Sequence, residues 1–392
     1  MKVVGITTQQ EVYVGSKDRN FRINEFLMVM DPHQGDLIGE VVEAKTYNKY
    51  IPLSIHGDLT DSSVLESLKA IGYNIEEDTI YIAKIRLLNE ALYPIETGSN
   101  VRTPVFHEVE DLMVQSDAEE GLVLGVIRNT DQMVDDMDAK YRDLLYTFED
   151  GKLFKQRDIP YIFNIKDMHQ YPHIGVFGGS GSGKSFGLRV ILEELMKLNI
   201  PTIVLDPHFE MDFSETGDYM DGDEGDIYGD RFKCMQVGFH IGVRFEDLST
   251  QDIKNLLDAS GKLTDSMSNV VDILFKRRDS YNSFLNRLNM LVEAQEEGSL
   301  DRIDARIAGA TSDLEREGWR KRKEIYLSYD NICPYSSVRG ILWRLYRLNN
   351  EGIFSKDIKP IEEGLHMGKL MVIQGSTRIL QVFSTYLLNN LY

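Results

Sequence analysis

Apolar and polar residues alternate in short stretches along the first third of the chain. These stretches are bounded by turn residues such as Asp-Pro and Gly-Asp and lie at residues 2–7, 11–14, 26–30, 37–42, 80–87 and 122–127. Alternation with a period of two is typical of strands with one buried face, and many short strands at this spacing favour a barrel or sandwich. A helix is predicted at residues 61–71, between two of the strands. We therefore predict a small N-terminal β-barrel over residues 1–130.

The following segment, residues 131–158, lacks this alternation and is mostly polar. Four aspartates lie close together in it: Asp135, Asp136, Asp138 and Asp143. We interpret the segment as a connector between two domains. A short hairpin or a helix that bridges the domains is the alternative, and the pattern does not choose between them.

A different pattern begins at residue 159. An apolar strand is predicted at residues 173–177, followed by a glycine-rich turn and a helix at residues 185–198 with its apolar residues on one face. Pro201 then precedes a second apolar strand at residues 202–205. Strand, turn, helix and strand in this order form a βαβ unit, which predicts a parallel sheet in an α/β domain.

The rest of the chain combines helices with one more strand. Helical periodicity dominates residues 249–349, a block longer than one crossover, so we interpret it as a helical insertion in the α/β domain. Residues 369–373 form the next apolar strand, and residues 379–392 have the spacing of an amphipathic helix. The sequence stops inside that helix without a cap. We therefore assign the α/β domain to residues 159–392 and expect the natural chain to continue beyond them.

The composition is that of a soluble globular protein, with 42% hydrophobic and 27% charged residues. A length of 392 residues fits two or three domains. Cys234 and Cys333 are far apart and have no partners at metal-binding spacing, so we expect neither a disulfide nor a zinc site. The sequence contains no apolar run long enough for a transmembrane helix and no leader-like N-terminus, so we expect a cytoplasmic location.

The formal net charge of −20 argues against a protein that coats nucleic acid with its whole surface. A ring or channel that is acidic outside and basic inside stays compatible with this charge. Much of the acidic excess is concentrated at residues 212–230, a glycine-rich stretch without Lys or Arg, which predicts a solvated loop.

The glycine-rich turn matches the P-loop pattern G-x-x-x-x-G-K-[ST] at every fixed position. Its residues are Gly178, Gly179, Ser180, Gly181, Ser182, Gly183, Lys184 and Ser185. Such a loop wraps a phosphate with backbone amides, and the following helix adds its positive N-terminal end. Lys184 is expected to reach the β- and γ-phosphates, and the Ser185 hydroxyl to bind Mg²⁺. Together with Phe186, these residues form the predicted binding site for ATP and Mg²⁺.

Acidic residues follow the second predicted strand, at Asp206 and Glu210. The carboxyl ends of parallel strands face the ligand crevice, so both carboxylates are candidate catalytic groups near the γ-phosphate or the metal. We favour a supporting role for Asp206 because its strand comes directly after the P-loop helix. A helix cap or an acid of the loop is the alternative for both residues, and His208 is more readily explained as structural than as catalytic.

An ATPase usually carries a metal-binding Asp and a water-activating Glu together after a later apolar strand. The best later strand here, residues 370–373, ends in Gln374 instead. Either these acids lie beyond residue 392, or the chain by itself is not a competent ATPase.

The order of these features resembles the HerA ATPases of the HerA/FtsK group. The resemblance is carried by the small barrel, by residues 173–185 and by the segment from Ile203 to Glu210, which contains Asp206-Pro207-His208. Residues 94–104 are similar to a turn of the family's barrel, residues 124–127 to the strand that closes it, and residues 340–354 and 368–373 to a later helix and strand. Two positions depart from the family: Phe209 stands where Gly is common, and Gln374 where an acid is common.

The resemblance implies a RecA-like domain that assembles into a homo-hexameric ring, hydrolyses ATP at subunit interfaces and pulls double-stranded DNA through a central pore. Members of this group act with nucleases in DNA-end processing or in bacterial antiphage systems, and the barrel is the usual docking surface for the partner. A second hypothesis is a nucleotide-bound ring scaffold that assembles and regulates an effector enzyme. A membrane-tethered pump of the same superfamily is disfavoured because the sequence has no membrane segment.

Two basic runs are candidate contacts to DNA phosphates. One comprises Arg316 and residues 320–323 around Trp319, and the other is Lys276-Arg277-Arg278. The competing interpretation is a solvated helix face balanced by neighbouring acids, which we favour for both runs.

Overall fold

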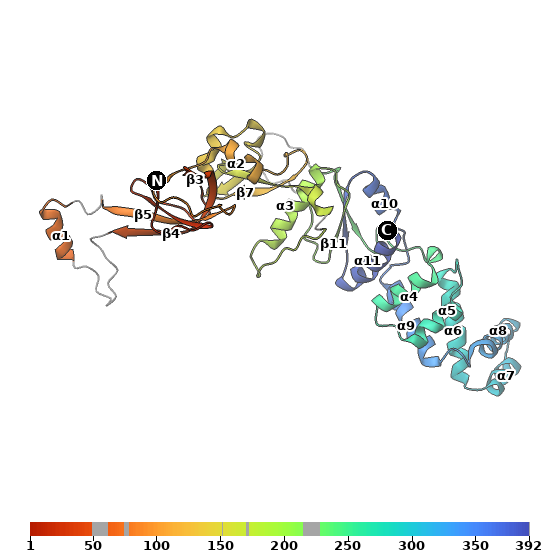
Figure 1. The fold of residues 1–392 in the computed structure, drawn as a ribbon. Helices are drawn as coiled ribbons and strands as arrows, with labels where there is room; N and C mark the ends of the chain where they lie inside the picture. Colours follow the sequence, from red (N-terminus) through yellow and green to blue (C-terminus); the bar gives the residue numbers. More distant parts are fainter. Residues whose placement is uncertain (49–61, 74–77, 151, 170–171, 215–227, 392) are drawn as a thin grey trace. The chain divides into compact units, whose positions relative to one another are not determined.

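The computed structural model describes residues 1–48, 62–73, 78–150, 152–169, 172–214 and 228–391. Contacts divide the chain into two compact units, Met1–Gly175 and Val176–Tyr392 (Figure 1). Most of the acidic stretch that we predicted as a solvated loop, residues 215–227, lies outside the described residues.

Six strands of the first unit form a closed barrel in the order β1-β2-β5-β4-β3-β6. Their bounds are β1 Lys2–Val4, β2 Glu11–Ser16, β3 Phe26–Asp31, β4 Gly35–Asn48, β5 Thr79–Leu87 and β6 Asn100–Arg102. Alternate apolar residues of these strands, among them Val12, Val14 and Ile85, are fully buried inside the barrel. The predicted N-terminal barrel is confirmed, and the helix predicted beside it is α1, Ser62–Ala70.

The barrel closes through a different strand from the one we expected. Residues 124–127 belong to β7, Leu122–Ile127, which pairs antiparallel with β10, Ile159–Phe163, in a separate two-stranded sheet. Closure is instead made by β6, which pairs with both β1 and β3. With three residues, β6 is too short to show an alternating pattern, whereas the apolar residues of β7 pack against the helix α2, Phe106–Met113.

The polar segment between the predicted domains contains short elements. Strands β8, Tyr146–Glu149, and β9, Lys152–Lys155, form an antiparallel hairpin, which was one of the alternatives for this segment. The same segment contains the 3₁₀ helices η1 Asp131–Asp136 and η2 Ala139–Tyr141, and a third, η3 Ile165–His169, follows β10.

A parallel three-stranded sheet forms the centre of the second unit, in the order β11-β13-β12. The strands are β11 Thr202–Asp206, β12 Phe232–Gln236 and β13 Leu370–Gln374. Alternate residues of β13 face opposite layers: Leu370 and Val372 pack with the helix α3, whereas Met371 and Ile373 belong to the core that contains α11. Helices on both faces of a parallel sheet are the arrangement of an α/β domain, as predicted.

The helices that cover this sheet are α3 Lys184–Lys197, α10 Lys359–His366 and α11 Thr377–Leu391 (Figure 1). Strand β12 was not predicted from the sequence, because Lys233 and Gln236 leave only two consecutive apolar residues between them, Cys234-Met235.

The strand expected at residues 173–177 is not formed. Residues 172–179 have no regular secondary structure, and the side chains of Ile174, Val176 and Phe177 are exposed. An isolated strand is not stable without a hydrogen-bonded neighbour. Among the described strands, β11, β12 and β13 pair only with one another, so this apolar segment has no partner there.

The predicted helical insertion is present as six helices, α4 to α9 (Figure 1). They span α4 Thr250–Ala259, α5 Asp265–Leu274, α6 Tyr281–Glu297, α7 Leu300–Gly309, α8 Asp313–Tyr329 and α9 Tyr335–Asn350. Five of them begin at a Ser or Thr whose side chain accepts a hydrogen bond from a backbone amide of the first turn, which stabilises each helix start. No helix in the described ranges has the length and apolar character to cross a membrane.

An aromatic cluster joins this helical block to the segment that follows β12. The Phe245 ring, in the 3₁₀ helix η4, Phe245–Asp247, lies with its centroid 5.1–6.3 Å from those of four other rings. The four neighbours are Phe275, Tyr281, Phe284 and Phe354.

We predict that Phe245→Ala lowers the free energy of unfolding of the helical block by about 3–5 kcal/mol, because it opens a cavity in this cluster. Both tryptophans, Trp319 and Trp343, lie in the block, so urea unfolding followed by tryptophan fluorescence measures the effect there. The matched control is Phe239→Ala, since Phe239 is 70% exposed. Equal unfolding midpoints for the two variants would contradict the role given to the cluster.

Candidate functional site

The glycine-rich loop turns into helix α3 through backbone conformations that favour glycine. Gly181 and Gly183 have φ angles of +76° and +83°, in the left-handed region where a side chain is strained. At Gly178 the constraint is space, because a Cβ atom there would lie 2.3 Å from the Ser182 hydroxyl oxygen. The structure therefore explains why the two fixed glycine positions of the P-loop pattern, Gly178 and Gly183, are glycine.

The loop presents backbone amides at the start of α3. The first helical hydrogen bond is donated by the Gly187 amide to the Gly183 carbonyl at 2.9 Å, so the amides of residues 184–186 lie ahead of it. The Lys184 ammonium donates to the Gly179 carbonyl at 2.5 Å, and the Ser182 amide donates to the same oxygen at 3.3 Å. Amides, a helix N-terminus and a cation together favour a bound phosphate group.

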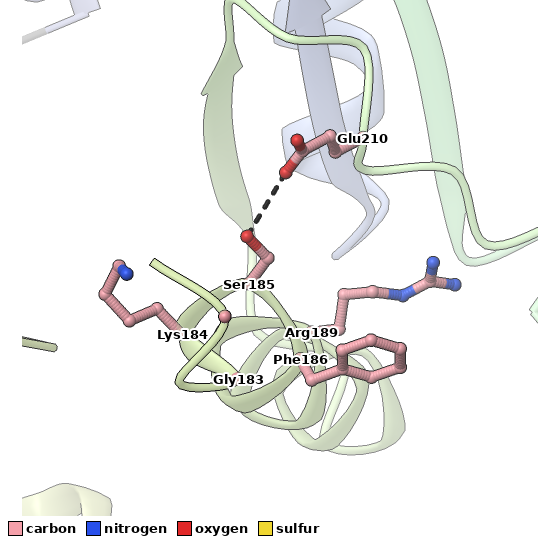
Figure 2. Close-up of a pocket in the computed structure, with 7 residues that line it drawn as sticks. Gly183, Lys184, Ser185, Phe186, Arg189 and Glu210 are labelled. Atoms are coloured by element: carbon pink, nitrogen blue, oxygen red, sulfur yellow. Dashed lines mark hydrogen bonds between the residues drawn. The ribbon is translucent and has the colours of Figure 1, made fainter. Parts of the chain in front are cut away.

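Ser185 and Glu210 meet across the site. The Ser185 hydroxyl donates to a Glu210 carboxylate oxygen at 3.2 Å, and Figure 2 shows the two side chains pointing toward each other. Ser185 comes from the first turn of α3, and Glu210 from the loop after β11. The Ser185 hydroxyl is an oxygen ligand of the kind that Mg²⁺ prefers, and the Glu210 carboxylate lies beside it.

Asp206 holds the loop that carries Glu210. Asp206 is 4% exposed, and its carboxylate accepts hydrogen bonds from the His208 amide at 3.2 Å, the Met211 amide at 3.0 Å and the Gln374 side chain at 3.3 Å. Burial by itself would raise the pKa of Asp206, but these hydrogen bonds outweigh it and hold the pKa below its ordinary value. Both carboxylate oxygens of Asp206 already accept hydrogen bonds from the protein. The role of Asp206 is therefore to hold the loop that positions Glu210.

The same loop contains a strained residue beside Glu210. Phe209 has a φ angle of +59°, although a bulky side chain disfavours this region and Phe209 is 52% exposed. The bonds from residues 208 and 211 to Asp206 enclose Phe209 and hold it in this conformation. Glycine would adopt this backbone conformation without strain.

One cavity of about 440 Å³ includes the loop and the carboxylate (Figure 2). It is lined by Gly181, Gly183, Lys184, Ser185, Phe186, Arg189 and Glu210. Arg189 was missed by the sequence reasoning, although its position three residues after Phe186 places both on one face of α3. The structure therefore brings Lys184, Ser185, Phe186 and Glu210 together, while Asp206 lies behind the loop.

The two candidate DNA-binding runs differ in their ion pairs. On α8, Arg322 pairs with Glu293 at 2.6 Å and Lys323 with Asp304 at 2.5 Å, which matches the interpretation of a solvated, neutralised helix face. The run Lys276-Arg277-Arg278 lies between α5 and α6 and is exposed. Within the described part of the chain, none of these three cations is within ion-pair distance of a carboxylate.

The carboxyl ends of the sheet hold one acid. The described strands β11, β12 and β13 end in Asp206, Gln236 and Gln374, and none of them is followed directly by an Asp-Glu pair. Asp206 and Gln374 are register partners of the parallel pair β11–β13, which places the Gln374 amide on the Asp206 carboxylate.

A glycine loop that opens a helix, with a Lys and a Ser at its end and a parallel sheet beside it, defines a P-loop nucleoside triphosphatase. The family described as helicase HerA, central domain, matches residues 148–391. This match covers more than half of the 392 residues, and the chain belongs to this family. No curated protein gives a match. The resemblance to HerA ATPases is thus confirmed, and with it the assignment as a P-loop ATPase of the HerA/FtsK group.

We predict that Asp206→Asn destabilises the second unit by about 1–3 kcal/mol, because an amide cannot accept all the hydrogen bonds that the buried carboxylate accepts. The pKa of Asp206 is lowered in the folded chain, so its stabilisation is present above the ordinary pKa of about 3.9 and is lost as the pH falls through the lowered value. Thermal unfolding at neutral and acidic pH tests this.

The control for this prediction is Asp230→Asn, which changes an exposed aspartate. The difference in stability between the unsubstituted chain and Asp206→Asn is expected to shrink in acid. A difference that stays constant down to the lowest accessible pH would show that the carboxylate charge is not what stabilises the loop.

Proposed function

We propose that the chain binds Mg²⁺–ATP in the cavity at the start of α3 and hydrolyses it, as part of a HerA-type hexameric ring that moves on double-stranded DNA. In this proposal a nuclease or antiphage effector docks on the N-terminal barrel. The observation that carries the proposal is the convergence of Lys184, Ser185 and Glu210 on one cavity. Membership of the HerA family supports the coupling to DNA.

Each residue of the cavity has a role in phosphoryl transfer to water. Lys184 exchanges its bond to the Gly179 carbonyl for the terminal phosphates, while the amides of residues 184–186 hold the phosphate oxygens. The Ser185 hydroxyl would hold a magnesium ion, which would supply positive charge against the phosphates. Glu210 orients the attacking water and accepts its proton, and Asp206 positions Glu210 through the loop.

The proposed contact to DNA is the turn Lys276-Arg277-Arg278. Its backbone is fixed by Asp279, whose carboxylate accepts the Lys276 amide at 3.0 Å and is itself buried in an ion pair with Arg287. A fixed, exposed group of cations in a chain with a net charge of −20 suits a phosphate backbone.

The alternative function is a nucleotide-bound ring that assembles and regulates an effector without using hydrolysis. The observation in its favour is that no described strand of the sheet ends in an Asp-Glu pair. Both functions need the triphosphate site, so they differ only in whether the bound nucleotide is hydrolysed to drive movement.

We expect ATP hydrolysis that double-stranded DNA stimulates. Lys184→Ala is expected to remove both binding and hydrolysis, whereas Glu210→Gln should keep ATP binding and lower the hydrolysis rate by about 10²–10⁴-fold, because it removes the proton acceptor. Phosphate release with and without DNA, beside a direct ATP-binding measurement, distinguishes these results. ATP binding without hydrolysis, combined with normal assembly of an effector, would favour the scaffold instead.

We also predict that the double variant Arg277→Ala/Arg278→Ala weakens DNA binding in a salt-dependent way. If each arginine contacts one phosphate, the slope of log affinity against log salt concentration falls by about 2 in magnitude. Fluorescence anisotropy of a labelled duplex over a salt series measures this slope. The matched control, Arg320→Ala/Lys321→Ala, changes two exposed cations of α8 that lie 4.0 Å from Glu317. An unchanged slope for the first variant would exclude the turn as a phosphate contact.

A further inference from the structure

A large aromatic side chain is exposed at the triphosphate site. Phe186 directly follows Ser185 in the first turn of α3, is 77% exposed and lines the same cavity as Lys184 and Glu210. The phosphate-binding groups of that cavity explain the loop, the lysine and the serine. They do not explain an aromatic ring, because a triphosphate has no apolar surface to place against it.

Arg189 extends this part of the cavity. It lies one helical turn after Phe186, on the same face of α3. Its guanidinium donates to the Asp212 carbonyl at 2.8 Å and lies 5.1 Å from the centre of the Phe213 ring, so its position is fixed by the loop after β11. Figure 2 shows the Phe186 ring and the Arg189 guanidinium on one side of the helix and Lys184 on the other.

The order of the groups along the first turn gives the direction of a bound nucleotide. Lys184 is placed for the terminal phosphates, Ser185 would hold a magnesium ion, and the Phe186 amide comes next. A nucleotide that runs along this series carries its sugar and base away from Lys184, toward the side of the cavity where Phe186 and Arg189 lie.

We propose that the Phe186 ring is the stacking platform for the nucleobase, with Arg189 as a donor at the edge of the base. The inference rests on the proposed triphosphate site and adds the part of it that distinguishes a nucleotide from a bare polyphosphate. Stacking uses the π-face that every base has, so the platform accepts purines and pyrimidines. The ligand class is therefore a nucleoside triphosphate, recognised by its aromatic base as well as by its phosphates.

The test compares two ligands that share the phosphates but not the base. Affinities for Mg²⁺–ATP and for Mg²⁺–tripolyphosphate are measured by titration calorimetry on the unsubstituted chain and on Phe186→Ala. Loss of one base–aromatic stack is expected to weaken ATP binding by roughly 5- to 150-fold and to leave tripolyphosphate binding unchanged. Phe239→Ala removes another exposed phenylalanine, outside this cavity, and should change neither affinity.

A second variant keeps an aromatic ring at the position. Phe186→Trp is expected to retain ATP affinity, and the fluorescence of its new indole should change on addition of ATP but not of tripolyphosphate. If Phe186→Ala keeps a normal thermal unfolding curve and weakens both ligands equally, or weakens neither, the platform is excluded while the triphosphate site stands. If the unsubstituted chain binds neither ligand, the proposed function itself fails.

Discussion

The proposed binding of a phosphate depends on the absence of side chains at three positions of one loop. Gly181 and Gly183 adopt left-handed backbone angles, and Gly178 lies where a Cβ atom would collide with the Ser182 hydroxyl. These conformations let the loop meet the N-terminus of α3 with its amides exposed ahead of the first helical hydrogen bond. Helix α3 begins at Lys184, and this start places the side chains of Lys184 and Ser185 at the cavity.

The opposite wall of the cavity depends on the sheet. The parallel register of β11 and β13 places Gln374 beside Asp206, and the bonds that Asp206 accepts set the loop from which Glu210 reaches Ser185. Strand β13 comes after the helical insertion in the chain, with only α10 between them. Two of its residues pack in the core of the insertion, and the two that alternate with them pack against α3. The helical block and the P-loop helix are thus packed on one sheet, which gives a physical route for coupling between them.

Features with a local cause could be predicted from the sequence. The P-loop follows from glycine chemistry, the helical insertion from apolar periodicity with Ser or Thr at the helix starts, and the barrel from period-two alternation. Features that depend on which strands pair with each other could not be predicted from the sequence. The short closing strand β6 and the separate sheet of β7 and β10 have no local signal that assigns one strand to its neighbour.

The candidate site shows the same division. Lys184 and Ser185 were predicted from the motif, but the contact between Ser185 and Glu210 depends on where the loop after β11 folds back. Arg189 became visible only with the cavity, because its partners Asp212 and Phe213 lie in that same loop. The strand expected at residues 173–177 had the right composition and still lacks a partner among the described strands, which shows that apolar content alone does not make a strand.

The most direct test of the triphosphate site is equilibrium binding of labelled ATP in magnesium buffer to the folded chain and to Lys184→Ala. We expect saturable binding at one site per chain, and a loss of that binding when the ammonium group is removed while the unfolding temperature stays the same. Binding that is absent from the unsubstituted chain, or that Lys184→Ala leaves intact, would contradict the assignment of residues 178–185 as the site that holds the phosphates.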